Sequence, residues 1–204
     1  MMNKRLKQGS TFLLAVALTF PLLTLPGAKA ANAIDTDAEC SIQFDIGGNS
    51  SELLSASIPV NLYKVASVDV SGNYTATGTF AKLDLSSVSA DNLDTAAATW
   101  SERAAEAKKL LKDDTEPTTT VTLTQGRGTA TRLKTGLYLV DTPKVITPNY
   151  TYTFTPYLVS LPTNNYYNGK DASDNWIYNL TGSNAVGLKT EQHVRYGNLV
   201  INKE

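Results

Sequence analysis

The stretch that decides the fold is "KTGLYLVDT", residues 134–142, followed closely by "YTYTFTPYLVSLP", residues 150–162. Both segments alternate apolar residues with polar or hydroxylated ones, and both are rich in tyrosine, threonine and valine. A period of two with such side chains predicts β-strands that bury at least one face. The most distinctive sequence in the chain therefore belongs to strands, and neither stretch lies beside a pattern typical of catalysis.

The same period of two recurs along most of the chain, with turn residues between the segments. Ser71-Gly72-Asn73 predicts a hairpin, and Gly126-Arg127-Gly128 predicts a second turn. Strands at this spacing, joined by turns, favour an antiparallel β-sandwich. Besides the two opening stretches, the expected strands are 40–46, 58–70, 74–80, 119–124, 129–133, 175–182 and 196–204.

One segment, at about 94–112, breaks this period and predicts an amphipathic helix inserted between strands. It is rich in alanine, lysine and glutamate, and Asp94 or Thr95 is the candidate N-cap. Its apolar face carries Trp100, with Ala104, Ala107 and Leu111 at helical spacing. We expect the helix to lie across the sheet with Trp100 as its core anchor. The alternative is a helix that binds a partner.

The first 30 residues have the features of a secretory signal peptide. A basic head precedes an apolar run over residues 12–25, and small residues follow it. This order predicts export and cleavage after Ala30 or Ala33. Pro21 and the shortness of the run argue against an uncleaved membrane anchor. The expected location is secreted or at the cell surface, with no membrane association after cleavage.

The charge balance of the mature chain excludes some partners. Removing the signal peptide takes away four of 18 basic residues and none of 19 acidic ones, which leaves a net charge of −5. An acidic exported chain is a poor match for nucleic acid or an anionic membrane surface. We expect neither as a partner.

The search for catalytic residues gives a negative prediction. His193 is the only histidine, no Gly-x-Ser-x-Gly elbow is present, and there is no phosphate-binding glycine loop. Zinc sites need several histidines or cysteines, and Cys40 is the only cysteine. Cys40 cannot form an internal disulfide and is expected in the core. We expect no enzyme activity, no cofactor and no metal.

Aromatic side chains offer a binding function as an alternative. Tyr166 and Tyr167 lie in the polar loop "NNYYNGKDASDN", where exposed rings can contact a glycan or a host or matrix protein. Trp176 and Tyr178 are two residues apart, so they share one strand face and are expected to pack inward.

The order of these segments resembles the N-terminal domain of Gram-positive sortase-assembled pilins, whose domains are immunoglobulin-like and of the collagen-adhesin B type. The resemblance rests on "VNLYKVASVDVSGNYT", the helix with Trp100, "LKTGLYLVDT", "YTFTPYLVSLP" and "NWIYNL". It covers most of residues 40–204 and implies an immunoglobulin-like sandwich that forms one bead of a covalent surface fibre. The implied partners are sister pilin subunits and a sortase.

The resemblance also implies an acceptor lysine. In the family, a sortase joins the sorting-signal threonine of one subunit to a lysine that follows the tryptophan strand of the next. Lys189 in "VGLKTEQ" occupies that position, although Gly187-Leu188 stands where the family has Tyr-Pro. Lys170 is the alternative acceptor.

An internal isopeptide bond is a further implication of the resemblance. The family joins a lysine on an early strand to an asparagine on the last, with an acid between them. The corresponding residues are Lys64 and either Asn202 or Asn198. Thr142 occupies the position at which the family has its acid. Asp141 lies one residue earlier, so its side chain is expected to lie on the opposite face of the strand.

The predicted organisation is a signal peptide over 1–30 and a sandwich domain over 31–195. Residues 196–204 are either its last strand or the start of a further domain. No Leu-Pro-x-Thr-Gly sorting signal with an apolar tail is present. Two functions follow: a structural pilin or stalk domain, and an adhesin-like binding module.

Overall fold

The computed structural model describes residues 33–47, 51–93, 95–164 and 176–196, and these form a mostly β fold. Most strand pairs are antiparallel, which confirms the predicted sandwich, whereas β1 pairs in parallel with β10 and β11. The strands are β1 (Glu39–Asp45), β2 (Ile58–Val68), β3 (Tyr74–Ala76), β4 (Thr119–Leu123), β5 (Arg127–Lys134), β6 (Gly136–Asp141), β7 (Val145–Ile146), β8 (Tyr150–Phe154), β9 (Tyr157–Leu161), β10 (Asn179–Leu180), β11 (Val186–Gly187) and β12 (Thr190–Val194).

The helical elements are few. The helix α2 spans Ala97–Leu110, and the short helix α1 spans Ser51–Ser55. Two 3-10 turns lie at Gly78–Phe80 and Gly182–Asn184. None of the helices within the described ranges is long and apolar enough to span a membrane.

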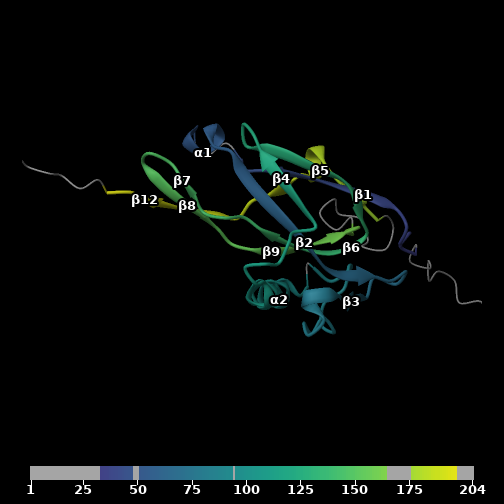
Figure 1. Ribbon diagram of the computed structural model, residues 1–204. Helices are drawn as coiled ribbons and strands as arrows, with labels where there is room; N and C mark the ends of the chain where they lie inside the picture. Colours follow the sequence, from purple (N-terminus) through teal and green to yellow (C-terminus); the bar gives the residue numbers. More distant parts are fainter. Residues whose placement is uncertain (1–32, 48–50, 94, 165–175, 197–204) are drawn as a thin grey trace, which may run out of the picture. The chain divides into compact units, whose positions relative to one another are not determined.

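The central sheet has the order β3, β2, β6, β9, and β6 is its most buried strand. Leu137 and Leu139 of β6 pack with α2, whereas Tyr138 and Val140 pack with β1 and β5. Figure 1 shows α2 on one side of this sheet and β1 and β5 on the other. The "GLYLV" stretch is therefore covered on both faces, which explains its nearly continuous apolar character.

The second sheet, in which β1 pairs with β5, β10 and β11, forms the other wall of the main core. Its strand β1 directs Cys40, Ile42 and Phe44 inward, and each of these side chains is at most 1% exposed. Burial raises the pKa of the Cys40 thiol to about 11. The prediction that Cys40 is a core residue is confirmed.

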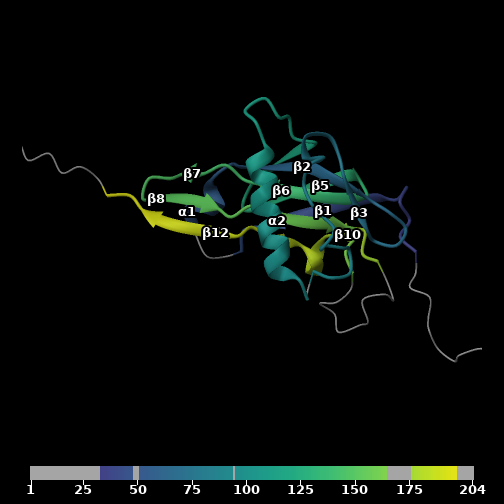
Figure 2. The same cartoon turned by 90° about the horizontal axis from the view of Figure 1, so that it is seen from below.

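The helix α2 packs across the strands of the central sheet, as Figure 2 shows. Trp100, Ala104 and Ala107 are buried, so the predicted apolar face and core anchor are confirmed. The predicted cap is wrong, because the N-cap is Ala96 and no side chain caps it. Asn92 lies beside the start of the helix, where its backbone carbonyl accepts from the Ala96 N–H at 3.0 Å and its Oδ1 accepts from the Trp100 Nε1–H at 2.9 Å.

The stretch 150–162 contains two strands that belong to different sheets. β8 pairs with β12 and β7, whereas β9 pairs with β6. The chain passes from one sheet to the other at Pro156, which lacks the N–H needed to continue a strand ladder. The expected strands at 74–80 and 175–182 are also shorter than predicted: β3 ends at a 3-10 turn, and β10 has two residues.

The β7–β8 turn is attached to α1 through the Glu52 carboxylate. Glu52 accepts hydrogen bonds from the Thr147 hydroxyl and from the Asn149 side-chain amide and backbone N–H. These bonds favour the charged carboxylate, so they lower the pKa of Glu52. The bond from Thr147 has the largest effect. The side chain joins two elements that are 95 residues apart in the sequence.

We expect this attachment to depend on pH. Because the pKa of Glu52 is lower in the folded chain, its contribution is fully present above the unfolded pKa, near 4.5, and is lost as the pH falls through the folded pKa. NMR titration of the Thr147 and Asn149 amides should show release in that acid range. Glu52→Gln should remove this titration; if the same titration persists in Glu52→Gln, another group is responsible.

Candidate functional site

A groove lies between α2, the outer edge of β9 and the segment that follows Ile177. Its volume is about 760 Å³. From α2 it is lined by Ala97, Trp100 and Ser101, and from β9 by residues 157–160. The opposite wall includes Leu180, Val186 and Lys189. Most of this lining is apolar, so the groove suits an apolar segment of chain.

The strand β9 forms an edge of the central sheet at this groove. Among the described residues, β6 is its only strand partner. The chain from Ile177 to Lys189 contacts the ends of β9 but leaves its middle uncovered: Thr163 and Ile177 exchange backbone hydrogen bonds of 3.1 and 2.9 Å, and the Thr155 N–H donates to the Lys189 carbonyl at 2.9 Å. Between these points, alternate backbone groups of β9 point toward the groove.

Lys189 lies at one end of the groove and is exposed. Its Nζ is 5.3 Å from the centre of the Tyr157 ring, which is a cation–π contact. The backbone on both sides is fixed, since the Leu188 N–H donates to the Asp45 carbonyl and the Tyr157 hydroxyl donates to the Gly187 carbonyl. The fold therefore fixes the backbone at Lys189 and leaves its amine accessible. An amine that acts as a nucleophile must be accessible in this way, and it attacks in its neutral form.

Lys64 has a different environment. It lies on β2 opposite Tyr138, and its side chain is partly buried between the two sheets. Burial lowers the pKa of Lys64, with a further lowering from Lys134 and an opposing effect of Cys40. This setting suits a lysine that reacts inside the domain rather than with another molecule.

The structure does not bring Asp141 to Lys64. Asp141 pairs in register with Asn61, three residues from Lys64, so the two side chains lie on opposite faces of the sheet. The Asp141 carboxylate accepts a hydrogen bond from Lys108 of α2 at 2.6 Å. Asn198 and Asn202 lie outside the described residues, so the isopeptide bond stays a prediction.

The remaining candidates do not form a site with these residues. Tyr166, Tyr167 and Lys170 lie outside the described residues. His193 is exposed, 3.3 Å from the Thr153 hydroxyl and 3.9 Å from Glu191. Within the described part of the chain, no group of three or more His, Cys, Asp or Glu side chains is arranged to hold a metal ion.

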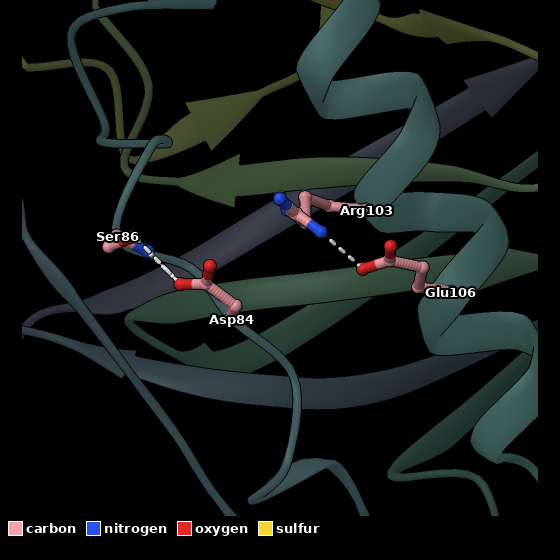
Figure 3. A network of polar contacts seen from close by, with 4 residues as sticks. All are labelled: Asp84, Ser86, Arg103 and Glu106. Atoms are coloured by element: carbon pink, nitrogen blue, oxygen red, sulfur yellow. Dashed lines mark hydrogen bonds and ion pairs between the residues drawn. The ribbon is translucent and has the colours of Figure 1, made fainter.

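Figure 3 shows two polar pairs close to one another, one on α2 and one on the loop at 84–86. Arg103 donates to Glu106 at 2.5 Å within the helix, and Asp84 accepts from the Ser86 hydroxyl at 2.7 Å. The Ser86 bonds, aided by Arg103, lower the pKa of Asp84. The Ser86–Asp84 bond lies within the loop and the Arg103–Glu106 bond lies within the helix; only the charge of Arg103 acts between the two pairs, on Asp84.

Sequence reasoning missed the groove and Tyr157. Tyr157 and Lys189 are 32 residues apart, and their contact arises only when β12 returns alongside β8. The local pattern of "PYLVSL" predicts a buried strand but cannot show that, among the described residues, only one edge of this strand has a strand partner.

Comparisons with known proteins complete the description. No protein-family model matches the chain, and no curated protein is similar to it. Solved structures similar to it include the fimbrial protein FimP from Actonomyces oris, at 21% identity and a TM-score of 0.44, with 78% of this chain and 31% of that chain covered.

Two further similar structures are major pilins of Corynebacterium diphtheriae. SpaD has 21% identity and a TM-score of 0.43, with 79% of this chain and 32% of that chain covered. SpaA has 18% identity and a TM-score of 0.39, with 74% and 30% covered. The chain thus spans about a third of the length of these pilins.

Proposed function

We propose that the chain is a structural subunit or stalk domain of a Gram-positive surface pilus, exported through its signal peptide. In this proposal Lys189 is the lysine to which a sortase joins a sister subunit. The observation that carries the proposal is the placement of Lys189: an exposed amine on a fixed backbone at the end of an apolar groove. The order of strand motifs, which resembles sortase-assembled pilins, supports it independently.

The geometry suits transfer of an acyl group to lysine. A sortase holds its substrate as a thioester, which the neutral amine attacks, forming an amide and releasing the cysteine thiol. The attacking amine must be reachable and must approach from a defined direction. The Tyr157 ring lies beside the Lys189 Nζ, 5.3 Å from it, while the groove leaves room for the peptide that carries the acyl group.

The exposure of the other lysines supports this choice. Lys64 is partly buried between the sheets, where a sortase cannot reach it without opening the domain. Lys144 is also exposed but does not line the groove. Comparing Lys144 with Lys189 therefore tests whether exposure alone is sufficient or whether the position at the groove is required.

The test is ligation by a pilus-polymerising sortase of a fluorescent peptide that contains a Leu-Pro-x-Thr-Gly motif. We expect one label per chain, mapped to Lys189 by tandem mass spectrometry, because only this amine combines exposure with the groove. Lys189→Arg should abolish the labelled product, and the matched control Lys144→Arg should retain it. Equal labelling of the two variants would refute the assignment.

A further inference from the structure

The strand β12 forms an exposed border of the small sheet that it shares with β8 and β7. In the described part of the chain, β8 is its only strand partner. Thr190 is partly buried, and every residue from Glu191 to Tyr196 is exposed. Figure 2 shows the three strands side by side, with β12 along one border. An edge strand of this kind can accept a further strand.

The hydrogen bonds to β8 fix which backbone groups of β12 point outward. The Lys189 carbonyl accepts from the Thr155 N–H, and the Arg195 N–H donates to the Asn149 carbonyl, each at 2.9 Å. Because such bonding alternates along an antiparallel pair, the odd-numbered residues of this segment bond to β8. The even-numbered residues of β12 therefore direct their backbone groups away from β8: Thr190, Gln192 and Val194.

The outer face of β12 carries charges of both signs. Glu191, His193 and Arg195 are spaced two apart, so their side chains share one face. A row of like charges on an edge strand would repel a second copy of the same strand. Here the acid and the arginine lie at equal distances on either side of His193, so a reversed copy of the strand brings opposite charges together.

One antiparallel register satisfies both the backbone and the charges. When His193 lies opposite His193 of a second copy, Glu191 lies opposite Arg195 of that copy, and the twofold axis repeats this pair. Gln192 then lies opposite Val194. These residues direct their backbone groups outward, so they can form the hydrogen-bonded pairs of the new ladder.

The neighbouring registers each fail a condition. A shift by one residue pairs an outward-pointing residue with one that already bonds to β8, so the ladder cannot form. A register centred on Gln192 places Lys189 opposite Arg195, where like charges are destabilising. A register centred on Val194 leaves Glu191 without a cationic partner.

The other face of β12 adds apolar contact in the same register. Val194 and Tyr196 are 57% and 91% exposed, and they are two of the four large hydrophobic side chains exposed among the described residues. Tyr196 lies opposite Thr190 of the second copy, and the two Val194 side chains are diagonal neighbours across the ladder. The pairing therefore covers apolar surface that a single chain leaves in water.

We propose that two copies of the chain associate through β12, which pairs antiparallel with β12 of the second copy about a twofold axis at His193. The same surface of both copies forms the contact, so the assembly closes at a dimer. This interface goes beyond the proposed function, because it needs neither the Lys189 amine nor a sortase.

Sedimentation velocity of the full mature chain tests the proposal. We expect a monomer–dimer equilibrium between about 10 and 500 µM and no larger species. Glu191→Arg and Arg195→Glu each place like charges opposite one another twice, so each should weaken the dimer at least about tenfold. The matched controls Glu102→Arg and Lys109→Glu make the same changes at exposed positions of α2 and should leave the dimer unchanged.

Mixing the two variants gives the sharpest result. The Glu191→Arg chain has a cation at both positions and the Arg195→Glu chain has an anion at both, so the mixture should form a heterodimer although neither variant self-associates. A mixture that stays monomeric while circular dichroism shows both variants folded would overturn the proposal. A wild-type chain that stays monomeric up to about 500 µM would overturn it as well.

A disulfide trap tests the register without changing either charge. His193 is the position that meets itself, with Cα atoms about 4.5 Å apart in a non-hydrogen-bonded pair, so His193→Cys should form a disulfide-linked dimer with oxidised glutathione as the oxidant. In the same register the two copies of position 196 lie about 20 Å apart. Tyr196→Cys should therefore stay monomeric, although random encounter would link this more exposed position at least as readily.

Equal cross-linking of the two cysteine variants would overturn the register. The wild-type chain is the blank for this experiment, because its only cysteine, Cys40, is 1% exposed. The trap also decides the matter if Arg195→Glu is unfolded through loss of its bond to the Thr147 carbonyl.

The covalent and non-covalent proposals fail separately. Lys189→Arg keeps the positive charge and should leave sedimentation unchanged while it abolishes ligation. If ligation at Lys189 is observed and association is not, the β12 dimer is wrong and the proposed function stands.

Discussion

Gly136→Ala is expected to lower the free energy of unfolding by about 3 kcal/mol or more. Gly136 begins β6 with φ at +145°, a backbone conformation that side chains rarely adopt. A Cβ at this position would lie 2.4 Å from the Ala66 carbonyl oxygen and 2.8 Å from Cε of Lys64. Relief requires β2 and β6 to separate at the centre of the sheet.

Urea unfolding followed by circular dichroism measures this loss. Gly187→Ala is the matched control, since its φ is unstrained and the nearest atom to an added Cβ, the Asp45 carbonyl oxygen, is 4.0 Å away. We expect the control to stay within about 1 kcal/mol of the wild type. Equal stability of the two variants would show that the pairing of β2 with β6 is placed incorrectly.

Trp100→Ala is expected to cost about 3 to 5 kcal/mol. Trp100 is 3% exposed, and its ring packs edge-on against Tyr74, with 6.1 Å between the ring centres; it anchors α2 to the central sheet. Its removal leaves a cavity under the helix that the surrounding backbone cannot fill. Thermal and urea unfolding at low protein concentration measure the change without a contribution from association.

Trp100→Phe separates packing from hydrogen bonding. Phenylalanine keeps most of the ring volume but loses the Nε1–H bond to Asn92, a bond worth about 1 kcal/mol. We therefore expect the phenylalanine variant to lie between the wild type and Trp100→Ala. A Trp100→Ala chain as stable as the wild type would mean that α2 does not depend on this anchor.

The features that sequence predicts well are those that depend on local pattern. The six residues of β6 and the buried face of α2 follow from side-chain periodicity, because each position reports which face it covers. The position of Asp141 on the face opposite to Lys64 was predictable for the same reason, because a shift of one residue along a strand moves a side chain to the other face.

The features that sequence did not predict depend on contacts between distant segments. The stretch 150–162 has one continuous pattern, yet Pro156 divides it between two sheets. The parallel pairing of β1 with β10 and β11 has no local signal, because it requires the chain to return beside its first strand. The start of α2 was misplaced because no side-chain cap marks it: the N-cap is Ala96, and no side chain accepts a hydrogen bond there.

The candidate site divides in the same way. Lys189 could be named from motif order, because its place after the tryptophan strand follows the resemblance to pilins. The groove and its contact between Tyr157 and Lys189 could not be predicted, since both depend on where the segment 177–189 turns toward β1.

The most direct test of the central claim is peptide mapping of the protein extracted from the walls of cells that produce it. We predict a ladder of species that resists boiling in SDS, with a branched peptide in which the Lys189 ε-amine is joined to a threonine carboxyl group. A chain recovered only as a monomer, with an unmodified peptide containing Lys189, would contradict the account of this protein as a covalent fibre subunit.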